Sequence, residues 1–392
     1  MINILSKIFK NKDNQNYYSL DFDNLNKKTK IEKIFNLISN YSSNSEIRYV
    51  GGSIRKIINR EIVDDIDLAT NVTPKNVCEI LSKNKISFYE TGIDHGTVTA
   101  KIDDYKFEIT TLRKDISTDG RHAEVKFSND WLEDASRRDF TFNAIYADLN
   151  GNFYDPFNGK KDLESGNVKF IGNPEKRIKE DYLRILRYVR FFLNYSKVDH
   201  NENLKKIIKQ NINGISKISS NRLLDELKKL VLSNGFIKIS KDEFCKEIIL
   251  LIFPQLTKLD VFNNLNDYSK KIIEQKDFIF LISLMIVDGT DNSEYFIYKY
   301  NISNNDKKRI RFLSNSFYKN FTKDTFTEKK LWKIFYLEGK DRLNDLFNFK
   351  LLENKKSDKK LIKLKKFFQT KEVPKFEIKA NTLIEKYNYK EG

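Results

Sequence analysis

The segment "RYVGGSIRKIINREIVDDIDLAT", residues 48–70, combines two features that a soluble protein does not need. A pair of glycines follows a short apolar run, and further along two aspartates flank a single isoleucine. The pattern predicts a strand, a tight turn and a helix at the glycines, then a second strand at the aspartates. Gly51 and Gly52 would let the backbone approach a phosphate at the start of that helix, with Arg55 one turn into it. The combination favours a site that holds a triphosphate against metal ions.

The aspartates are candidate metal ligands. Alternate side chains of a strand share a face, so Asp65 and Asp67 would point the same way while Ile66 enters the core. Paired carboxylates suit magnesium, and two-metal phosphoryl chemistry needs ions about 3.5–4 Å apart. Glu108, in another predicted strand, has the phase of a third acid. A DxD alone is more often a turn or a solvated strand end, so the prediction depends on the combination with the glycine turn.

The composition is that of a folded, basic protein. The chain has 392 residues, 40% of them hydrophobic, which allows roughly two to four domains with sizeable cores and argues against wholesale disorder. Its net charge of +16 favours a polyanionic partner such as nucleic acid. The alternative is a biased genome, because the chain is rich in Lys, Asn and Ile.

Cysteine usage and hydropathy indicate the compartment. Cys78 and Cys245 lie far apart without a CxxC motif, so neither a zinc site nor a disulfide framework is expected, and a reducing cytoplasm fits. The longest apolar run, residues 278–287, is about half of the roughly 20 residues that span a bilayer. It predicts a buried helix, and we expect no membrane association.

Strand and helix signals alternate from about residue 47 to residue 155, with hairpins expected around Asp103-Asp104 and Asn150-Gly151. From Pro174 onward the periodicity predicts helices only, including one over residues 174–195. The predicted fold class is α+β, with a mixed β-sheet and helices in an N-terminal head, followed by an all-α neck, body and tail. The expected divisions are an extension at 1–25, the head at 26–160, the neck at 161–240, and the body and tail at 241–392.

Asp181 and Arg184 are candidates for reading a base. Three residues apart on a predicted helix, their side chains would be neighbours on one face. Aspartate accepts hydrogen bonds and arginine donates them, which matches the amino group and ring nitrogen of cytosine or adenine. Guanine and uracil present the reverse pairing, and each unpaired buried polar group costs about 1–3 kcal/mol. The alternative for an isolated pair is a surface ion pair.

The motif string resembles the nucleotidyltransferase superfamily, and specifically the bacterial class II tRNA nucleotidyltransferase and poly(A) polymerase family. The resemblance begins with "GGSIR" and "DDIDLAT" and covers roughly residues 47–235. Four further segments look like that family in the same order: "TDGRHAEVKF" (118–127), "DASRRDFTFNAIYAD" (134–148), "EDYLRILRYVR" (180–190) and "SSNRLLDELKKL" (219–230).

The resemblance implies roles for several further residues. Arg138 and Asp139 match a motif expected to contact ribose and phosphate, with a structural ion pair as the alternative. Arg187 and Arg190 match nucleotide-binding positions. Helical geometry lets Arg187 reach the triphosphate from the side of Asp181, whereas Arg190 lies nearly opposite and could instead brace the helix or touch RNA.

Two features concern variation within that family. Asp119, Gly120 and Arg121 match a flexible loop associated with switching from C addition to A addition, so their presence favours complete CCA synthesis. The family commonly reads GGxxRD, whereas Lys56 stands here in place of the acid. The exchange puts a supporting contact in doubt and leaves the metal site intact.

The resemblance implies a template-independent enzyme that adds CCA to the 3′ end of tRNA from CTP and ATP, using two Mg²⁺ ions and releasing pyrophosphate. Lysine-rich helices of the tail would bind tRNA phosphates, and no protein partner is implied. The alternatives are a poly(A) polymerase, an enzyme that adds only A to tRNA, and an RNA-binding protein that has lost catalysis.

Overall fold

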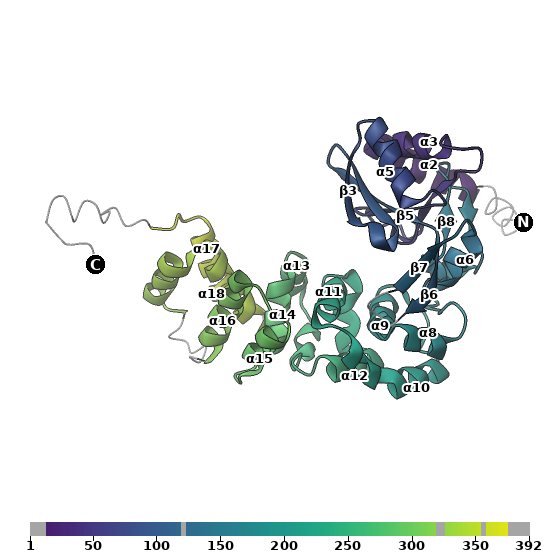
Figure 1. The fold of residues 1–392 in the computed structure, drawn as a ribbon. Coiled ribbons are helices and arrows are strands. Elements are labelled where there is room, and N and C mark those ends of the chain that lie inside the picture. The colour runs from purple at the N-terminus through teal and green to yellow at the C-terminus, as the bar shows by residue number, and fades with distance from the viewer. Residues whose placement is uncertain (1–12, 119–122, 319–325, 354–357, 375–392) are drawn as a thin grey trace, which may run out of the picture. The chain divides into compact units, whose positions relative to one another are not determined.

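The computed structural model describes residues 13–118, 123–318, 326–353 and 358–374 (Figure 1). The chain divides into two compact units, residues 1–218 and 219–392, which we call the head unit and the tail unit. The division differs from the boundary expected between residues 240 and 241. The helices of residues 161–218 belong to the head unit, so the elements that carry the candidate site form one body.

The head unit combines a mixed sheet with helices, as the α+β prediction requires (Figure 1). Its strands are β1 (Ile47–Val50), β2 (Ile66–Thr70), β3 (Ser87–Gly92), β4 (Thr97–Ile102), β5 (Tyr105–Thr111), β6 (Arg113–Thr118), β7 (Ala123–Phe127), β8 (Tyr146–Ala147) and β9 (Phe153–Tyr154). Its helices are α2 (Asp13–Thr29), α3 (Glu32–Ser39), α4 (Gly52–Ile58), α5 (Pro74–Lys83), α6 (Trp131–Ser136), α7 (Gly159–Ser165), α8 (Pro174–Glu180), α9 (Leu183–Tyr195) and α10 (Glu202–Asn211).

The main sheet has seven strands in the order β3-β4-β5-β2-β1-β8-β9, and β6 pairs with β7 in a separate ribbon. Both expected hairpins form: β4 pairs with β5, and β8 with β9. Among the strands that the structure describes, β2 and β5 form the single parallel pair, and there Asp67 stands opposite Glu108. The buried residues Val50 of β1, Ala69 of β2 and Trp131 of α6 belong to one hydrophobic core cluster.

Helix α2 crosses the expected boundary between extension and head. Its Phe22 is fully buried and packs against Tyr49 of β1, with ring centroids 5.2 Å apart. Its Asn26 donates a hydrogen bond of 2.8 Å to the carbonyl of Leu149 and accepts one from the Tyr49 hydroxyl. The segment from residue 13 is therefore part of the head, because these buried contacts tie it to the sheet.

The helix expected over residues 174–195 is two helices, and this prediction is wrong. α8 ends at Glu180, Asp181 has extended dihedral angles (φ −153°, ψ 105°), and α9 begins at Leu183. The Asp181 carboxylate accepts a 3.1 Å hydrogen bond from the Leu183 amide. A short acidic side chain that bonds its own downstream backbone competes with the helix, and here it starts a new one. Asp181 therefore lies at the junction.

In the tail unit the described residues form helices only, as the periodicity predicts (Figure 1). The helices are α11 (Ser220–Val231), α12 (Glu243–Ile252), α13 (Asp267–Glu274), α14 (Phe278–Ile286), α15 (Asn292–Lys299), α16 (Asn304–Tyr318), α17 (Glu328–Glu353) and α18 (Lys359–Gln369). Ser219 caps α11, and α14 is the buried helix expected from the longest apolar run. Within the described ranges, no helix combines the length and apolar character that crossing a bilayer requires.

Candidate active site

The glycine turn lies directly against one of the two aspartates. Gly51 has φ of +65°, a conformation that costs glycine little, and it connects β1 to α4. A Cβ atom on Gly52 would lie 3.2 Å from Oδ2 of Asp67, and one on Gly51 would lie 3.8 Å from the same oxygen. The Gly52 amide hydrogen-bonds to the Asp67 carboxylate. Glycine is needed here both for the turn and for the close approach of that carboxylate.

The three predicted acids lie on neighbouring segments. Asp67 is half-buried on β2, Asp65 is exposed just before that strand, and Glu108 is exposed on β5 at the register position opposite Asp67. Burial raises the pKa of Asp67, the charge of Arg138 lowers it, and the charge of Asp65 raises it again. Carboxylate oxygens gathered in this way are the hard ligands that a divalent cation prefers.

Helix α4 also fixes the segment that carries Asp65. The Ser53 hydroxyl accepts a 3.0 Å hydrogen bond from the Asp67 amide, and it lies 3.5 Å from the Asp65 carbonyl. Lys56 forms an ion pair with Asp64, and Asp64 accepts a 2.9 Å hydrogen bond from the Asp65 amide. The lysine that departs from the common motif therefore has an acidic partner beside the site.

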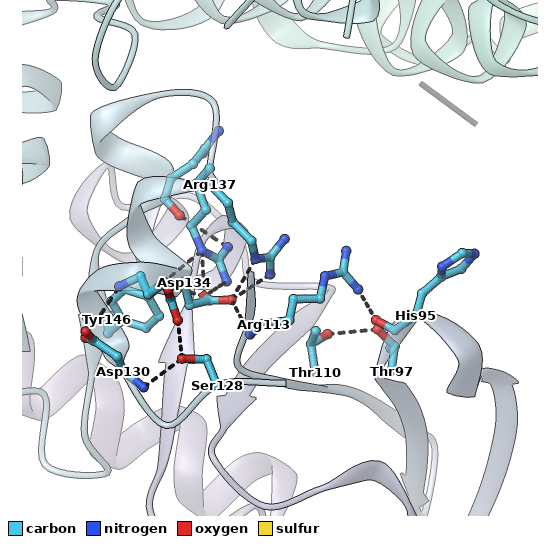
Figure 2. A network of polar contacts seen from close by, with 12 residues as sticks. His95, Thr97, Thr110, Arg113, Ser128, Asp130, Asp134, Arg137 and Tyr146 are labelled. Carbon is cyan, nitrogen blue, oxygen red and sulfur yellow. Dashed lines mark hydrogen bonds and ion pairs between the residues drawn. The ribbon is translucent and has the colours of Figure 1, made fainter. Parts of the chain in front are cut away.

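Arg138 lies just after helix α6, reaches the glycine turn and is held by a buried acid. Its Nη1 would lie 3.7 Å from a Cβ on Gly51. The carboxylate of Asp134, with the residue 1% exposed, accepts hydrogen bonds from Arg138 at 3.1 and 3.2 Å and from the Tyr146 hydroxyl at 2.7 Å. It also binds Arg137 at 2.7 Å (Figure 2).

Asp134 has a positioning role that sequence reasoning did not assign. Burial alone would disfavour its charged form, but Arg138, Arg137 and the Tyr146 hydroxyl outweigh burial and hold the pKa of Asp134 well below its usual range. The signal in the sequence is its spacing: an acid on a short helix, three and four residues before two arginines that directly follow the helix. Figure 2 also shows Arg113, whose side chain donates to the carbonyl of His95 and whose amide lies 3.4 Å from Asp134.

Asp139 is buried, and both its carboxylate oxygens have protein donors. Oδ1 accepts from the Phe140 amide at 2.9 Å and from Asn143 at 2.8 Å, and Oδ2 accepts from Arg187 Nε at 2.6 Å. Burial opposes its charge, but Arg187 and Asn143 hold the pKa of Asp139 well below its usual range. The geometry makes Asp139 an anchor for Arg187.

Three of the predicted arginines surround one aromatic ring. The guanidinium carbons of Arg190, Arg55 and Arg187 lie 4.2, 4.8 and 5.5 Å from the centroid of Phe191 on α9. Arg55 is 8% exposed and donates to Asn143 and to the Tyr195 hydroxyl, while its Nη2 would lie 3.9 Å from a Cβ on Gly52. This cluster places positive charge beside the glycine turn.

The candidate base-reading residues lie at the start of α9. The Arg184 amide donates a 3.0 Å hydrogen bond to the Asp181 carbonyl, so the two residues are one turn apart despite the helix break. Arg184 Nη1 donates to the Arg177 carbonyl at 2.7 Å and to the Glu180 carboxylate at 2.9 Å. Arg177 and Glu180 are functional candidates that sequence reasoning missed.

Asp119, Gly120 and Arg121 of the expected flexible loop are outside the described residues. In the tail, two cations of the basic segment 305–312 have carboxylate partners: Arg309 binds Asp345 and Asp277, and Arg311 binds Glu294.

The segment that carries this site is similar to known proteins. Residues 47–169 match the model of the poly A polymerase head domain. The human "CCA tRNA nucleotidyltransferase 1, mitochondrial" is 43% identical over 197 residues, which are 49% of this chain and 45% of that protein. A "CCA-adding enzyme" of Lactobacillus helveticus is 38% identical over 225 residues, 54% of this chain and 55% of the relative. The chain spans about half the length of these relatives.

Solved structures match over more of the chain. The CCA-adding enzyme of Bacillus stearothermophilus in complex with CTP has a TM-score of 0.68 at 20% identity, covering 92% of this chain and 89% of that one. The Thermotoga maritima CCA-adding enzyme complexed with tRNA has a TM-score of 0.61 at 19% identity, covering 91% and 86%. At these identities the likeness is one of fold. Residues 47–169 therefore match the poly A polymerase head domain, and the chain has a fold shared with CCA-adding enzymes.

Proposed function

We propose that this protein adds C, C and A to the 3′ end of tRNA, taking the nucleotides from CTP and ATP and releasing pyrophosphate at each step. The observation that carries the proposal is the Asp67 carboxylate, which meets the Gly52 amide and faces the charge of Arg138. This arrangement of an acid, a glycine turn and an arginine can bind a nucleoside triphosphate for attack at its α-phosphorus. The names of the relatives identify which nucleotidyl transfer to test first.

The donor set fits Mg²⁺. Asp65 and Asp67 would hold two such ions, with Glu108 contributing from the neighbouring strand. When bound, paired ions activate the attacking hydroxyl and stabilise the leaving pyrophosphate. The chain itself contributes the arrangement of the ligands: Ser53 fixes the Asp67 backbone, and the Lys56–Asp64 pair fixes the Asp65 amide.

The arginines bind the nucleotide. Arg138, Arg187 and Arg190 would contact the phosphates and sugar, and Arg55, buried beneath the turn, supplies positive charge from below. Asp139 holds Arg187 by a 2.6 Å ion pair and so acts through it. Each of these side chains is braced by the protein, which lowers the conformational entropy lost when a triphosphate binds.

Asp181 and Arg184 select the base. The carboxylate would accept from the exocyclic amino group of C or A, and the guanidinium would donate to the ring nitrogen. Three hydrogen bonds support this role. One joins Asp181 to the Leu183 amide at the start of α9, and two hold Nη1 of the Arg184 guanidinium. Uracil and guanine would face acceptor against acceptor and donor against donor.

An incorporation assay tests the proposal against its alternatives. The purified protein is incubated with a tRNA transcript that lacks its 3′ CCA and with each labelled nucleotide in turn. We expect two C residues and then one A, with neither G nor U. Long A tails on any RNA would favour a poly(A) polymerase, and addition of A only to tRNA that already ends in CC would favour an A-adding enzyme.

Substitution of the acids distinguishes an enzyme from an RNA-binding protein. Asp65→Ala and Asp67→Ala should abolish transfer and leave most tRNA binding, which a gel-shift titration measures. Full transfer by both variants would contradict the metal-binding role. Binding of tRNA by the tail and a cytoplasmic location stay predictions from the sequence.

A further inference from the structure

We propose that Arg177 is a positioning residue for base selection, acting through Glu180 on the guanidinium of Arg184. The inference rests on the proposed function, because it takes Asp181 and Arg184 as the pair that reads the base. It adds two residues, at the end of helix α8, for which no role is assigned above.

Arg177 is anchored to the segment that carries Arg138, one of the arginines proposed to contact the phosphates. Its side chain is 12% exposed, and its Nη2 donates to the backbone carbonyls of Arg137 and Arg138. Arginine suits this position because its rigid fork can hold several acceptors at once, whereas lysine offers a single nitrogen. The contacts tie the end of α8 to the residues that follow α6.

The Arg177 guanidinium also contacts Glu180, which in turn contacts Arg184 of the base-reading pair. Nη1 of Arg177 lies 2.5 Å from a carboxylate oxygen of Glu180, and that oxygen also accepts from Arg184 Nη1 at 2.9 Å. Arg184 Nη1 donates in addition to the backbone carbonyl of Arg177 at 2.7 Å. The Arg184 side chain is 12% exposed, so its guanidinium is held by a shared carboxylate and a carbonyl in a confined space.

This arrangement sets the angle of Arg184 relative to the base. A guanidinium is planar, so two acceptors on one nitrogen restrict the direction of the other donors. Without Arg177, Glu180 would lose the partner that fixes its orientation, and Arg184 would follow it. Misplacing Arg184 would weaken the selection of C and A over U and G. Triphosphate binding would weaken less, because Arg138 and Arg187 keep their own carboxylate partners.

The test compares Arg177→Met, Arg177→Lys and Glu180→Gln with wild type. The readout is the ratio of kcat/KM for CTP to that for UTP on tRNA lacking its CCA end, together with calorimetric Kd values for CTP and UTP. We expect Arg177→Met and Glu180→Gln to lower the CTP preference by about tenfold or more, because donors and acceptors of the pair would no longer match one base edge. Arg177→Lys should retain part of the preference, since it keeps the charge opposite Glu180.

Lys179→Met is the matched control. Lys179 lies on the same helix and forms a 2.6 Å ion pair with Glu175, but both side chains are about half exposed. The control should keep the wild-type preference. An unchanged preference in Arg177→Met and Glu180→Gln, with equal losses of kcat/KM for all nucleotides, would overturn the inference and leave a purely structural role.

The binding measurement separates this inference from the proposed function. A wild-type protein that transfers no C would overturn the function, whereas the Kd ratio would still report whether the pair selects a base. A wild type that binds CTP and UTP equally would overturn the inference. If Arg177→Met does not fold, as thermal melting would show, Glu180→Gln decides alone because it keeps the size and shape of the side chain.

Discussion

Two buried aspartates, Asp134 in the head unit and Asp345 in the tail unit, bind cations in nearly the same way. They are 1% and 3% exposed. Asp134 is bound by Arg137 and Arg138 at 2.7 and 3.1 Å, and Asp345 by Lys276 and Arg309, both at 2.7 Å. A list of salt bridges would not distinguish them.

The difference lies in what the cations reach beyond the aspartate. Arg138 extends from Asp134 to the glycine turn and Asp67. Arg309 extends from Asp345 to Asp277, the residue that caps helix α14. The first pair therefore positions a charge at the candidate active site, whereas the second joins helices of the tail. A buried aspartate paired with two cations therefore positions a candidate site residue in the head unit and stabilises helix packing in the tail unit.

The largest expected effect is that of Asp134→Asn. Removing one partner of a buried ion pair costs about 3–5 kcal/mol, and misplacing one stabilising charge in an active site costs about 10²–10³ in rate. We expect a loss of stability together with a loss of about 10²-fold in kcat per folded molecule. Urea unfolding and single-turnover transfer on tRNA measure the two losses. Wild-type kcat in the folded variant would show that Asp134 is structural only.

Asp345→Asn should lose stability alone. Lys276 would lose its ion pair with Asp345, whereas Arg309 would keep Asp277, so we expect a loss of about 3 kcal/mol in the free energy of unfolding. Transfer by the folded protein at saturating tRNA should stay near the wild-type rate. A large drop in kcat without unfolding would erase the distinction between the two aspartates.

The pH dependence of stability should also report Asp134. Its folded-state pKa is depressed, so its contribution is fully present above the unfolded value of about 3.9 and is lost as the pH falls from there towards the folded pKa. We expect the free energy of unfolding of wild type to fall more steeply between about pH 5 and pH 2 than that of Asp134→Asn. Parallel curves in urea titrations across this range would contradict the assignment.

The smallest effect is expected for Tyr146→Phe. The substitution removes the 2.7 Å hydrogen bond to Asp134 and the 3.1 Å hydrogen bond from Arg138 Nε, but it keeps the ring and both ion pairs of Asp134. A hydrogen bond to a charged group contributes about 1.5–3 kcal/mol, so the loss of stability should fall at or below that range. The change in kcat should be smaller than in Asp134→Asn, because Arg138 keeps its ion pair. An equal change in kcat would mean that Tyr146 itself positions Arg138.

Local signals predicted the strand–turn–helix at the glycines, the phase of Glu108 and both hairpins. Each depends on residues a few positions apart, where side-chain alternation and turn chemistry dominate. The single helix over 174–195 was wrong because its apolar period continues through the junction, while one side chain, Asp181, bonds the Leu183 amide and interrupts the backbone. Periodicity averages over many residues and does not register one such cap.

The sequence alone determined the strand–turn–helix at the glycines and predicted the acids from side-chain alternation, whereas the motif arginines were predicted from the family resemblance. Only the tertiary structure decided which carboxylate forms an ion pair with which cation. Asp139 and Arg187 are 48 residues apart in the chain, and Arg177 meets the carbonyl of Arg138 across 39 residues. Such pairs form where separate helices pack together, and no local pattern encodes the distance between two side chains that only folding brings into contact.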